Sequence, residues 1–157
     1  MRVGLGFDIH RLVDSRSLLL GGVKIPHSKG LLGHSDGDVL LHALCDALLG
    51  AVGAGDIGTY FPDTDPQWKG AASAKFVEKA LELVSRRDLR VANVDAVILT
   101  EEPKLSPHRT AIQRSVAQIL RIRDDRVNVK AKTMEKLGSI GAGEAMAATV
   151  VVLLEES

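Results

Sequence analysis

Regular alternation of apolar residues marks the first part of the chain as a β-strand. Over residues 2–13, every second residue is large and apolar: Val3, Leu5, Phe7 and Ile9. Side chains two positions apart lie on the same face of a strand, so these four share one face of what we expect to be a buried strand. The other face carries two glycines and then two polar residues: Gly4, Gly6, Asp8 and His10.

Apolar spacing in the rest of the chain predicts alternating helices and strands. Apolar residues three and four apart predict helices over residues 38–50, 73–87 and 106–121. Apolar runs between turn residues predict a hairpin over residues 17–25 and strands over residues 91–102, 126–133 and 145–156. Ser35 or Asp36 is the expected N-cap of the first helix. The other segments are expected to be loops.

This order of elements predicts a single domain over residues 1–157, of the α+β class. We expect a mostly four-stranded mixed sheet with the helices packed on one face, and a small hairpin near the N-terminus. Hydrophobic residues make up 45% of the chain but aromatic residues only 3%. The core is therefore expected to consist of Val, Leu, Ile and Ala.

Charge and composition exclude several classes of protein. Lys and Arg number 20, as do Asp and Glu, and this balance argues against a protein that coats nucleic acid. No apolar stretch approaches the roughly 20 residues of a membrane span, and no signal-peptide pattern is present. Gly53, Gly55 and Gly58 match G-x-G-x-x-G, but they follow a predicted helix, which excludes a dinucleotide-binding fingerprint. Cys45 is the only cysteine, and it lies in an apolar helical run, so we expect a buried thiol and a reducing compartment.

Asp8 and His10 form a first candidate pair of metal ligands. At i and i+2 of a strand they project from one face, about 6.6 Å apart along the strand. This spacing suits two side chains that converge on an ion bonded at roughly 2 Å. The simpler interpretation is a hydrogen-bonded polar pair at a strand end, because D-x-H alone is a weak signal.

The first predicted helix supplies a third candidate ligand. Asp38, His42 and Asp46 recur at a spacing of four among apolar neighbours, so they form one narrow polar stripe. A solvated helix edge explains the two aspartates well and the histidine less well. With Asp8 and His10, a neutral His42 imidazole would complete three protein ligands with an open position, as in catalytic zinc sites.

Two loops carry candidate substrate-binding groups. In "GHSDGD", His34 and Ser35 precede a helix N-terminus, where backbone N–H groups favour anions such as phosphate. In "GDIGTYFPDTD", several aspartates beside a glycine could bind the hydroxyls of a polyol: Asp56, Asp63 and Asp65. Ordinary Asx-turn chemistry explains these aspartates equally simply, and on the residues alone we favour it.

Polar residues also gather where two predicted strands end. These residues are Lys104, Lys132, Thr133 and Glu135. Ligands commonly bind outside the carboxyl ends of parallel strands. Lys and Thr suit phosphate, and a Glu carboxylate suits a hard divalent ion. A solvated surface rim remains the alternative.

Five segments of the chain resemble the 2-C-methyl-D-erythritol 2,4-cyclodiphosphate synthase family. They are "GFDIHRL", "GGVKIPHSKGLLGHSDGDVLLHALCDALLGA", "GDIGTYFPDTDPQWKGA", "NVDAVILTEEPKL" and "NVKAKTMEKLG". The resemblance covers essentially the whole chain. It implies a homotrimer with active sites between subunits. These sites would convert 4-diphosphocytidyl-2-C-methyl-D-erythritol 2-phosphate to the cyclic diphosphate with release of CMP, in the non-mevalonate isoprenoid pathway.

The resemblance also implies a role for individual residues. Asp8, His10 and His42 would bind zinc, and Glu135 a second divalent ion, magnesium or manganese. His34 and Thr133 would stabilise the transition state. The erythritol end would contact Ser35, Asp56, Ile57, Gly58, Phe61, Asp63 and Asp65. The cytidine diphosphate end would lie on the adjacent subunit, against Thr100, Pro103, Lys104, Leu105, Ser106, Lys132, Met134 and Glu135.

The sequence leaves two alternatives to this function, and it departs from the family pattern at four positions. Two lie in the predicted nucleotide pocket, namely Ser106, where an apolar residue is common, and Lys132, where Thr is common; the other two are Ser139 and Ala142. The alternatives are a zinc-dependent phosphoesterase and a non-catalytic module that binds a nucleotide or a metal. Many relatives carry Phe and Arg where this chain has Ser139 and Ala142, so we expect weak or absent binding of an isoprenoid diphosphate in the trimer cavity. A bacterial cytoplasm is the expected location, or a plastid if the chain is a processed form.

Overall fold

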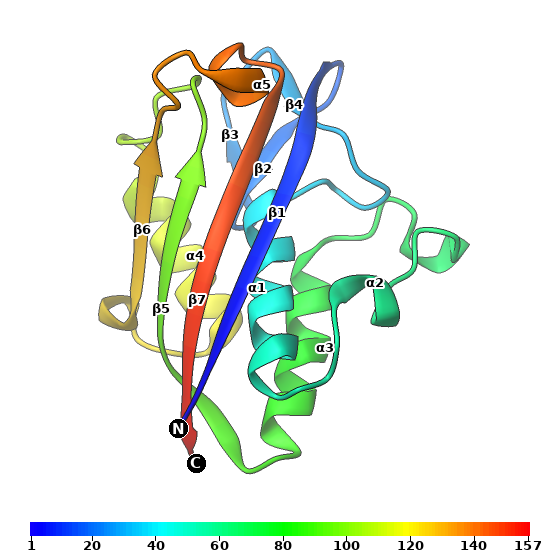
Figure 1. Ribbon diagram of the computed structural model, residues 1–157, viewed down its shortest axis with the longest axis vertical. Helices are drawn as coiled ribbons and strands as arrows, with labels where there is room; N and C mark the ends of the chain where they lie inside the picture. The colour runs from blue at the N-terminus through cyan, green and yellow to red at the C-terminus, as the bar shows by residue number, and fades with distance from the viewer.

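A mixed β-sheet forms one layer of the protein. The computed structural model describes residues 1–157, and the strands follow the order β4-β1-β7-β5-β6 (Figure 1). These strands are β1 (Arg2–Asp14), β4 (Lys29–Leu31), β5 (Leu89–Leu99), β6 (Val127–Lys132) and β7 (Ala145–Glu156). Only β5 and β6 run parallel. The predicted mixed sheet is confirmed, with a short fifth strand, β4, in a segment predicted as loop.

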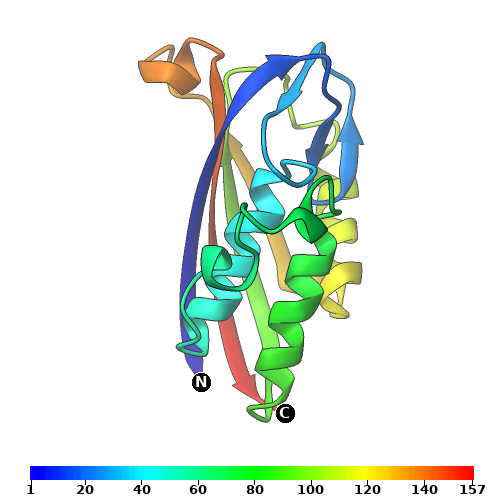
Figure 2. The ribbon, with the colours of Figure 1, turned by 90° about the vertical axis from the view of Figure 1, so that its right-hand side faces the viewer.

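Three helices cover one face of this sheet (Figure 2). They are α1 (Val39–Ala51), α3 (Ala74–Ser85) and α4 (Arg109–Leu120). The predicted hairpin, β2 (Leu18–Leu20) and β3 (Val23–Ile25), forms a separate two-stranded sheet. Four short helical segments lie in the connections: α2 (Ile57–Tyr60), η1 (Pro66–Trp68), η2 (Asp124–Arg126) and α5 (Gly138–Gly141). None of the helices has the length and apolar character that a membrane crossing requires.

Two helix starts differ from the prediction. The N-cap of α1 is Asp38, whose carboxylate accepts a hydrogen bond from the Leu41 N–H at 3.1 Å, and neither Ser35 nor Asp36 has this role. Helix α4 begins three residues later than expected, because a turn precedes it in which the His108 N–H donates to the Leu105 carbonyl at 2.9 Å.

Asp38 is part of the core and not of a solvated helix edge. Its side chain is fully buried and also accepts the N–H groups of Gly21 and Gly22, at 3.0 and 2.7 Å. Both glycines have positive φ and form the turn of the β2–β3 hairpin. One carboxylate therefore caps α1 and ties the hairpin to it.

Helix α1 lies directly on β1 because two glycines leave room for it. A Cβ atom on Gly4 would lie 1.9 Å from the Ala47 carbonyl oxygen, and one on Gly6 would lie 1.9 Å from the Ala43 oxygen. The glycine face of β1 is thus the buried face. Figure 1 shows β1 beside α1. Asp8 and His10 continue the glycine face of β1 toward this helix.

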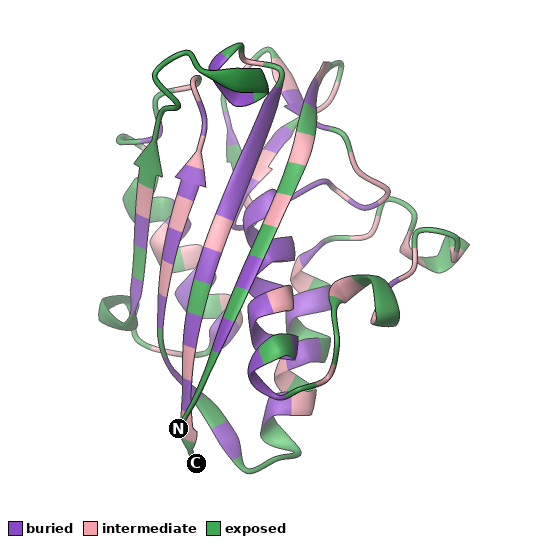
Figure 3. Ribbon diagram, viewed as in Figure 1, coloured by how far each residue is buried: buried purple, intermediate pink, exposed green.

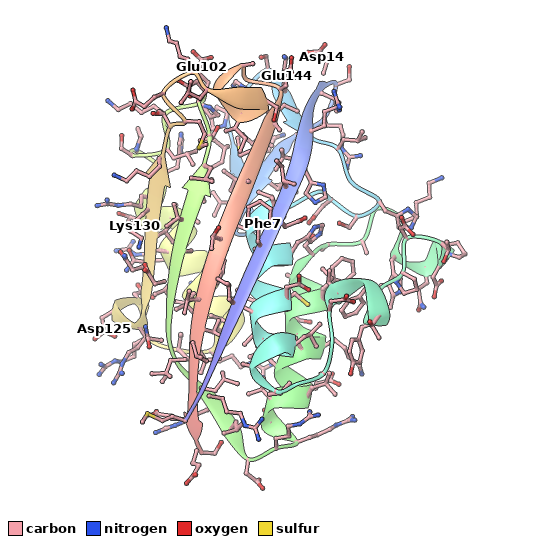
Figure 4. All side chains as sticks on the ribbon, viewed as in Figure 1. Phe7, Asp14, Glu102, Asp125, Lys130 and Glu144 are labelled. Atoms are coloured by element: carbon pink, nitrogen blue, oxygen red, sulfur yellow. The ribbon has the colours of Figure 1, made fainter.

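The apolar face of β1 is open in the single chain, contrary to the expected buried strand. Its side chains are 45–68% exposed: Val3, Leu5, Phe7 and Ile9. Figure 3 shows the resulting alternation of buried and exposed residues along β1, and Figure 4 marks Phe7 on this strand. Val151 of the neighbouring β7 is 39% exposed. We call Val3, Leu5, Phe7, Ile9 and Val151 the open sheet face.

The core between the sheet and the helices is aliphatic, as predicted. Its largest fully buried side chains include Leu40, Leu44, Ile98 and Met146. Cys45 is also fully buried, and its Sγ lies 3.5 Å from the Phe76 carbonyl oxygen. Burial raises the pKa of the Cys45 thiol, so this cysteine acts as a small core residue, as expected.

Candidate active site

Asp8, His10 and His42 meet at one point and are called here the metal triad. The Asp8 Oδ2 atom lies 2.8 Å from His10 Nε2 and 3.0 Å from His42 Nδ1. The two histidine nitrogens are 2.9 Å apart. The strand supplies the first two residues and α1 the third, so the close contact of β1 with α1 assembles the triad. The predicted convergence of these residues is confirmed.

The geometry of the metal triad fits a metal ion. Three donors of a tetrahedral ion, each at about 2.0–2.1 Å, lie roughly 3.3 Å from one another, close to the separations seen here. The donor set is two imidazole nitrogens and one carboxylate oxygen, with a fourth position open. Burial raises the pKa of the Asp8 carboxyl, but hydrogen bonds and charge interactions with His10 and His42 lower it to a net value of about 2. The carboxylate is therefore ionised at neutral pH.

The second ring nitrogen of His42 is held by two serine hydroxyls. His42 Nε2 lies 2.9 Å from Ser35 Oγ and 2.8 Å from Ser73 Oγ. Ser35, predicted to contact substrate, thus directs its hydroxyl at a metal-triad residue. Ser73 was not identified as a site residue from the sequence, because its position before α3 predicts only a helix start. It makes no side-chain capping bond there.

The metal triad opens on a cavity of about 420 Å³, called here the triad cavity. Its polar lining includes several predicted residues: His34, Ser35, Gly58 and Asp63. Phe61, also predicted, stacks on Phe76 with ring centroids 4.4 Å apart, and Trp68 meets both edge-on. Trp68 and Phe76 were missed by the sequence analysis. The available signal was that aromatic residues are rare in the chain and cluster between residues 60 and 76.

The loop carrying α2 forms one wall of the triad cavity through turns built on aspartates. Asp56 accepts the N–H and the hydroxyl of Thr59 at 2.9 and 2.8 Å. Asp65 caps η1 and accepts the Gln67 N–H at 3.0 Å. The Asx-turn interpretation thus holds for both residues, whereas Asp63 is exposed, lines the cavity and makes no side-chain hydrogen bond within the chain.

Asp46 holds this loop against α1. Its carboxylate accepts the N–H of Ile57 at 2.7 Å, and Ile57 lines the triad cavity. Burial, followed by the charges of Asp56 and Asp8, raises the pKa of the Asp46 carboxyl against the opposing hydrogen bond. The predicted solvated helix edge is therefore wrong for this aspartate too, since it has a structural partner.

A second pocket of about 420 Å³, called here the strand-end pocket, lies at the carboxyl ends of β5 and β6. It brings together most of the residues predicted for the nucleotide end: Thr100, Pro103, Lys104, Leu105, Ser106, Lys132 and Thr133. The parallel pairing of β5 with β6 explains this, because both strands end at the same edge. The strand-end pocket shares no residue with the triad cavity.

Met134 and Glu135 lie just beyond the strand-end pocket. The Met134 N–H donates to the Glu101 carboxylate at 3.2 Å, and the Thr133 hydroxyl donates to Glu135 Oε1 at 3.1 Å. Glu135 is exposed and belongs to no cluster of three metal-binding side chains. A single chain thus brings Glu135 together with Thr133 but not with the metal triad or His34.

The fold and the site together define a mixed α+β protein whose three-ligand metal-type centre opens on a cavity of small-molecule size. The YgbB family model matches residues 1–155. A 2-C-methyl-D-erythritol 2,4-cyclodiphosphate synthase from Synechococcus sp. (strain JA-2-3B'a(2-13)) is 56% identical over 99% of this chain and 99% of its own. The chain therefore belongs to the YgbB family, which is the family of the 2-C-methyl-D-erythritol 2,4-cyclodiphosphate synthases. Members of this family are enzymes, and the predicted resemblance is confirmed.

Solved structures agree with this assignment. The CDP complex of IspF from Plasmodium falciparum is 37% identical, with a TM-score of 0.87 over 99% of this chain and 96% of that one. The bifunctional IspDF from Campylobacter jejuni is 44% identical, with a TM-score of 0.95 over 99% of this chain. The chain spans only 42% of that longer protein.

Proposed function

We propose that the chain converts 4-diphosphocytidyl-2-C-methyl-D-erythritol 2-phosphate to 2-C-methyl-D-erythritol 2,4-cyclodiphosphate and releases CMP. One observation carries the proposal: the metal triad opens on the same cavity as His34 and Asp63. A metal-type centre beside a histidine and an unpartnered carboxylate suits a substrate with both phosphates and hydroxyls. Family membership and the CDP bound by the Plasmodium falciparum relative support the substrate class.

The proposed reaction is an intramolecular phosphoryl transfer. An oxygen of the 2-phosphate bonds to the β-phosphorus, the bond from that phosphorus to the bridging oxygen breaks, and this oxygen leaves with CMP. Because the nucleophile is already an ionised phosphate oxygen, no separate general base is required. The protein's task is to position the two phosphates and to neutralise their charge.

The metal triad would hold zinc for this task. Two imidazoles and one carboxylate are zinc ligands, and three protein ligands leave a position for substrate. When bound, zinc supplies Lewis-acid polarisation of a phosphate oxygen. His34, on the cavity wall, would donate a hydrogen bond to the transferring phosphoryl group. Thr133 would do the same from the strand-end pocket.

The two ends of the substrate would occupy the two pockets. In the triad cavity, the Asp63 carboxylate is free to accept a hydrogen bond from a hydroxyl of the erythritol. The other residues of this wall would also contact the erythritol end: Ser35, Asp56, Ile57, Gly58, Phe61 and Asp65. In the strand-end pocket, Lys104 and Lys132 would bind phosphate oxygens of the cytidine diphosphate. The exposed Glu135 carboxylate would hold magnesium or manganese, which when bound would neutralise phosphate charge.

A homotrimer would join the two half-sites. The triad cavity and the strand-end pocket share no residue within a chain, so one active site would pair the cavity of one subunit with the pocket of its neighbour. The open sheet face supports assembly, because five large apolar side chains lie together on it, each at least 39% exposed. The proposed location is a reducing compartment such as the bacterial cytoplasm, which fits the single buried thiol.

The test is CMP release from the authentic substrate, measured with and without zinc and magnesium. We expect release by the metal-loaded wild type, and at least a thousandfold reduction in His42→Ala. Asp125→Asn is the matched control, because Asp125 is exposed, lies outside both pockets and the open sheet face, and bonds only to Arg123. A protein that binds zinc and CDP but releases no CMP would be the non-catalytic module instead.

A further inference from the structure

The indole N–H of Trp68 is the only buried side-chain polar group in the chain without a hydrogen-bond partner. The surrounding side chains enclose this nitrogen so closely that water does not reach it. Folded proteins pair nearly all of their buried donors, because an unpaired donor loses its bonds to water and gains none in return. This exception lies in the candidate active site, where a ligand could supply the missing acceptor.

The neighbours of Trp68 explain its packing but not its N–H group. The ring meets Phe61 and Phe76 edge-on, with ring centroids 5.1 and 5.6 Å away. Neither phenyl ring has an oxygen or nitrogen that accepts a hydrogen bond, and the face of an aromatic ring accepts an N–H group only weakly. Trp68 therefore supplies apolar packing that a phenylalanine would also supply, together with a donor that this packing does not use.

Trp68 lies where a bound polyol phosphate would offer acceptors. It lines the triad cavity together with the metal triad, His34 and Asp63. The erythritol end of the proposed substrate carries hydroxyl and phosphate oxygens, and it would occupy this cavity. A buried N–H group that gains such an oxygen forms its hydrogen bond without first giving up a bond to water. The bond should therefore favour binding more than a bond from an exposed donor would.

Few hydrogen bonds hold Trp68 in its orientation. It ends η1, a single turn in the connection from α2 to α3, and Figure 1 shows that this connection projects away from the sheet. The backbone bonds within residues 62–69 are local, such as that from the Trp68 N–H to the Asp65 carbonyl at 3.2 Å. One hydrogen bond joins this stretch to a distant part of the chain, between the Asp65 carbonyl and His34 Nε2 at 3.3 Å. A small turn of the indole toward the cavity therefore breaks little structure.

We propose that Trp68 is a specificity-determining residue whose indole N–H donates a hydrogen bond to an oxygen of the erythritol end of the substrate. The inference rests on the proposed function. It adds a donor to a wall whose carboxylates can only accept hydrogen bonds: Asp56, Asp63 and Asp65. A site that pairs a buried donor with a ligand oxygen rejects ligands that lack the oxygen, because the donor then stays unpaired.

The first test compares Trp68→Phe with the zinc-loaded wild type, because phenylalanine keeps an aromatic ring and lacks the N–H group. Calorimetry measures the dissociation constants of two ligands. These are 2-C-methyl-D-erythritol 2,4-cyclodiphosphate, which carries the erythritol part, and CDP, which carries the nucleotide part. We expect Trp68→Phe to bind the cyclodiphosphate about 5- to 10-fold more weakly than the wild type and to bind CDP equally well.

Tyr60→Phe is the matched control, since it removes a polar group from a ring that neighbours Phe61 but does not line the triad cavity. It should bind both ligands like the wild type. Equal affinity of the wild type and Trp68→Phe for the cyclodiphosphate overturns the proposal, because the N–H group then has only a packing role.

A second measurement leaves the chain unsubstituted. Trp68 is the only tryptophan, so its indole N–H gives a single signal in a proton–nitrogen-15 correlation spectrum. Because a hydrogen bond to oxygen deshields the proton, we expect this signal to move downfield on saturation with the cyclodiphosphate and to stay in place with CDP. If the wild type binds no cyclodiphosphate, the proposed function fails. If it binds the cyclodiphosphate and the indole signal does not move downfield, only the role of Trp68 fails.

Discussion

The carbonyl oxygen of Ala43 occupies the place where a side chain on Gly6 would begin, only 1.9 Å from an ideal Cβ. This contact sets the distance between β1 and α1, and so the distance between the two histidines of the metal triad. Gly6→Ala should move α1 away from β1. We expect the free energy of unfolding, measured with urea, to fall by about 1–3 kcal/mol. Zinc binding should be lost as well.

Gly50→Ala is the matched control, since this glycine lies in α1 and a Cβ there would meet only the Leu5 carbonyl oxygen at 3.9 Å. Replacing a helical glycine by alanine is expected to be neutral or to stabilise the chain by up to about 1 kcal/mol. If Gly6→Ala were as stable as Gly50→Ala, close packing of α1 on β1 would not be what assembles the triad.

Asp38 is predicted to stabilise the fold without taking part in catalysis. Asp38→Asn replaces one of its two acceptor oxygens by an amide that faces a backbone N–H. We expect a cost of about 1–3 kcal/mol in free energy of unfolding. Asp125→Ala, which breaks only an exposed pair with Arg123, should change it by less than about 0.5 kcal/mol. Equal effects of the two substitutions would contradict a structural role for Asp38.

The stabilisation by Asp38 should depend on pH in a defined direction. Burial raises the pKa of this carboxyl above 3.8, although the N–H groups of Gly22, Leu41 and Gly21 lower it. A raised pKa in the folded state means that the folded chain holds the proton more tightly than the unfolded chain. The contribution of Asp38 to the free energy of unfolding is therefore greatest below about pH 4, and it declines as pH rises through the pKa of the folded state. The stability difference between wild type and Asp38→Asn should be larger at pH 4 than at pH 7, and the opposite trend would refute the assignment.

Asp46 is expected to set substrate affinity through the loop that begins at Ile57. Asp46→Ala removes the acceptor of the Ile57 N–H, whereas Asp46→Asn keeps a carbonyl oxygen there. Steady-state kinetics should show KM raised about tenfold for Asp46→Ala, which corresponds to about 1.4 kcal/mol, and a nearly normal KM for Asp46→Asn. Equal KM values for the two variants would show that the hydrogen bond does not hold the loop.

The open sheet face should mediate assembly. Light scattering on the wild type is expected to give three times the chain mass of 16.8 kDa. Leu5→Asp places a charge at a side chain that is 67% exposed in the single chain, so it should fold normally and remain monomeric. Glu78→Lys, on the exposed side of α3, should remain trimeric. If the wild type were itself monomeric, active sites shared between two subunits would be excluded.

Subunit mixing tests whether two chains form one active site. His42→Ala disables the triad cavity, and Thr133→Val disables the strand-end pocket. Every mixed trimer of the two variants pairs two intact halves at one of its three sites, which is about a quarter of all sites after random mixing. Mixing after mild dissociation should therefore restore part of the turnover. No recovery despite proven exchange of subunits would indicate that each chain works alone.

Local patterns predicted most of the fold. The apolar run over residues 145–156 is a strand with the same limits in the structure, because a buried run between loops has few alternatives. The expected burial of β1 was wrong for one of its two faces. Its large apolar residues form the open sheet face, and its glycines are buried against α1. Alternation defines two faces, but only the partners of the strand decide which face is covered.

The site was predictable where residue chemistry was unusual for its position. A histidine among apolar helical residues and a D-x-H strand indicated the metal triad. Asp38 and Asp46 were wrongly assigned to a solvated helix edge. Their hydrogen-bond partners are backbone N–H groups in distant turns, and no pattern in the sequence predicts such contacts. Ser73 was missed for the same reason, because its role depends on a contact across 31 residues with His42.

Phosphorus NMR of the reaction product tests the central claim most directly. Incubation of the metal-loaded wild type with 4-diphosphocytidyl-2-C-methyl-D-erythritol 2-phosphate should yield two mutually coupled ring phosphates and one equivalent of CMP. The metal-stripped protein and His42→Ala should leave the substrate unchanged. Linear monophosphates in place of the coupled pair would contradict the account and identify the chain as a phosphoesterase.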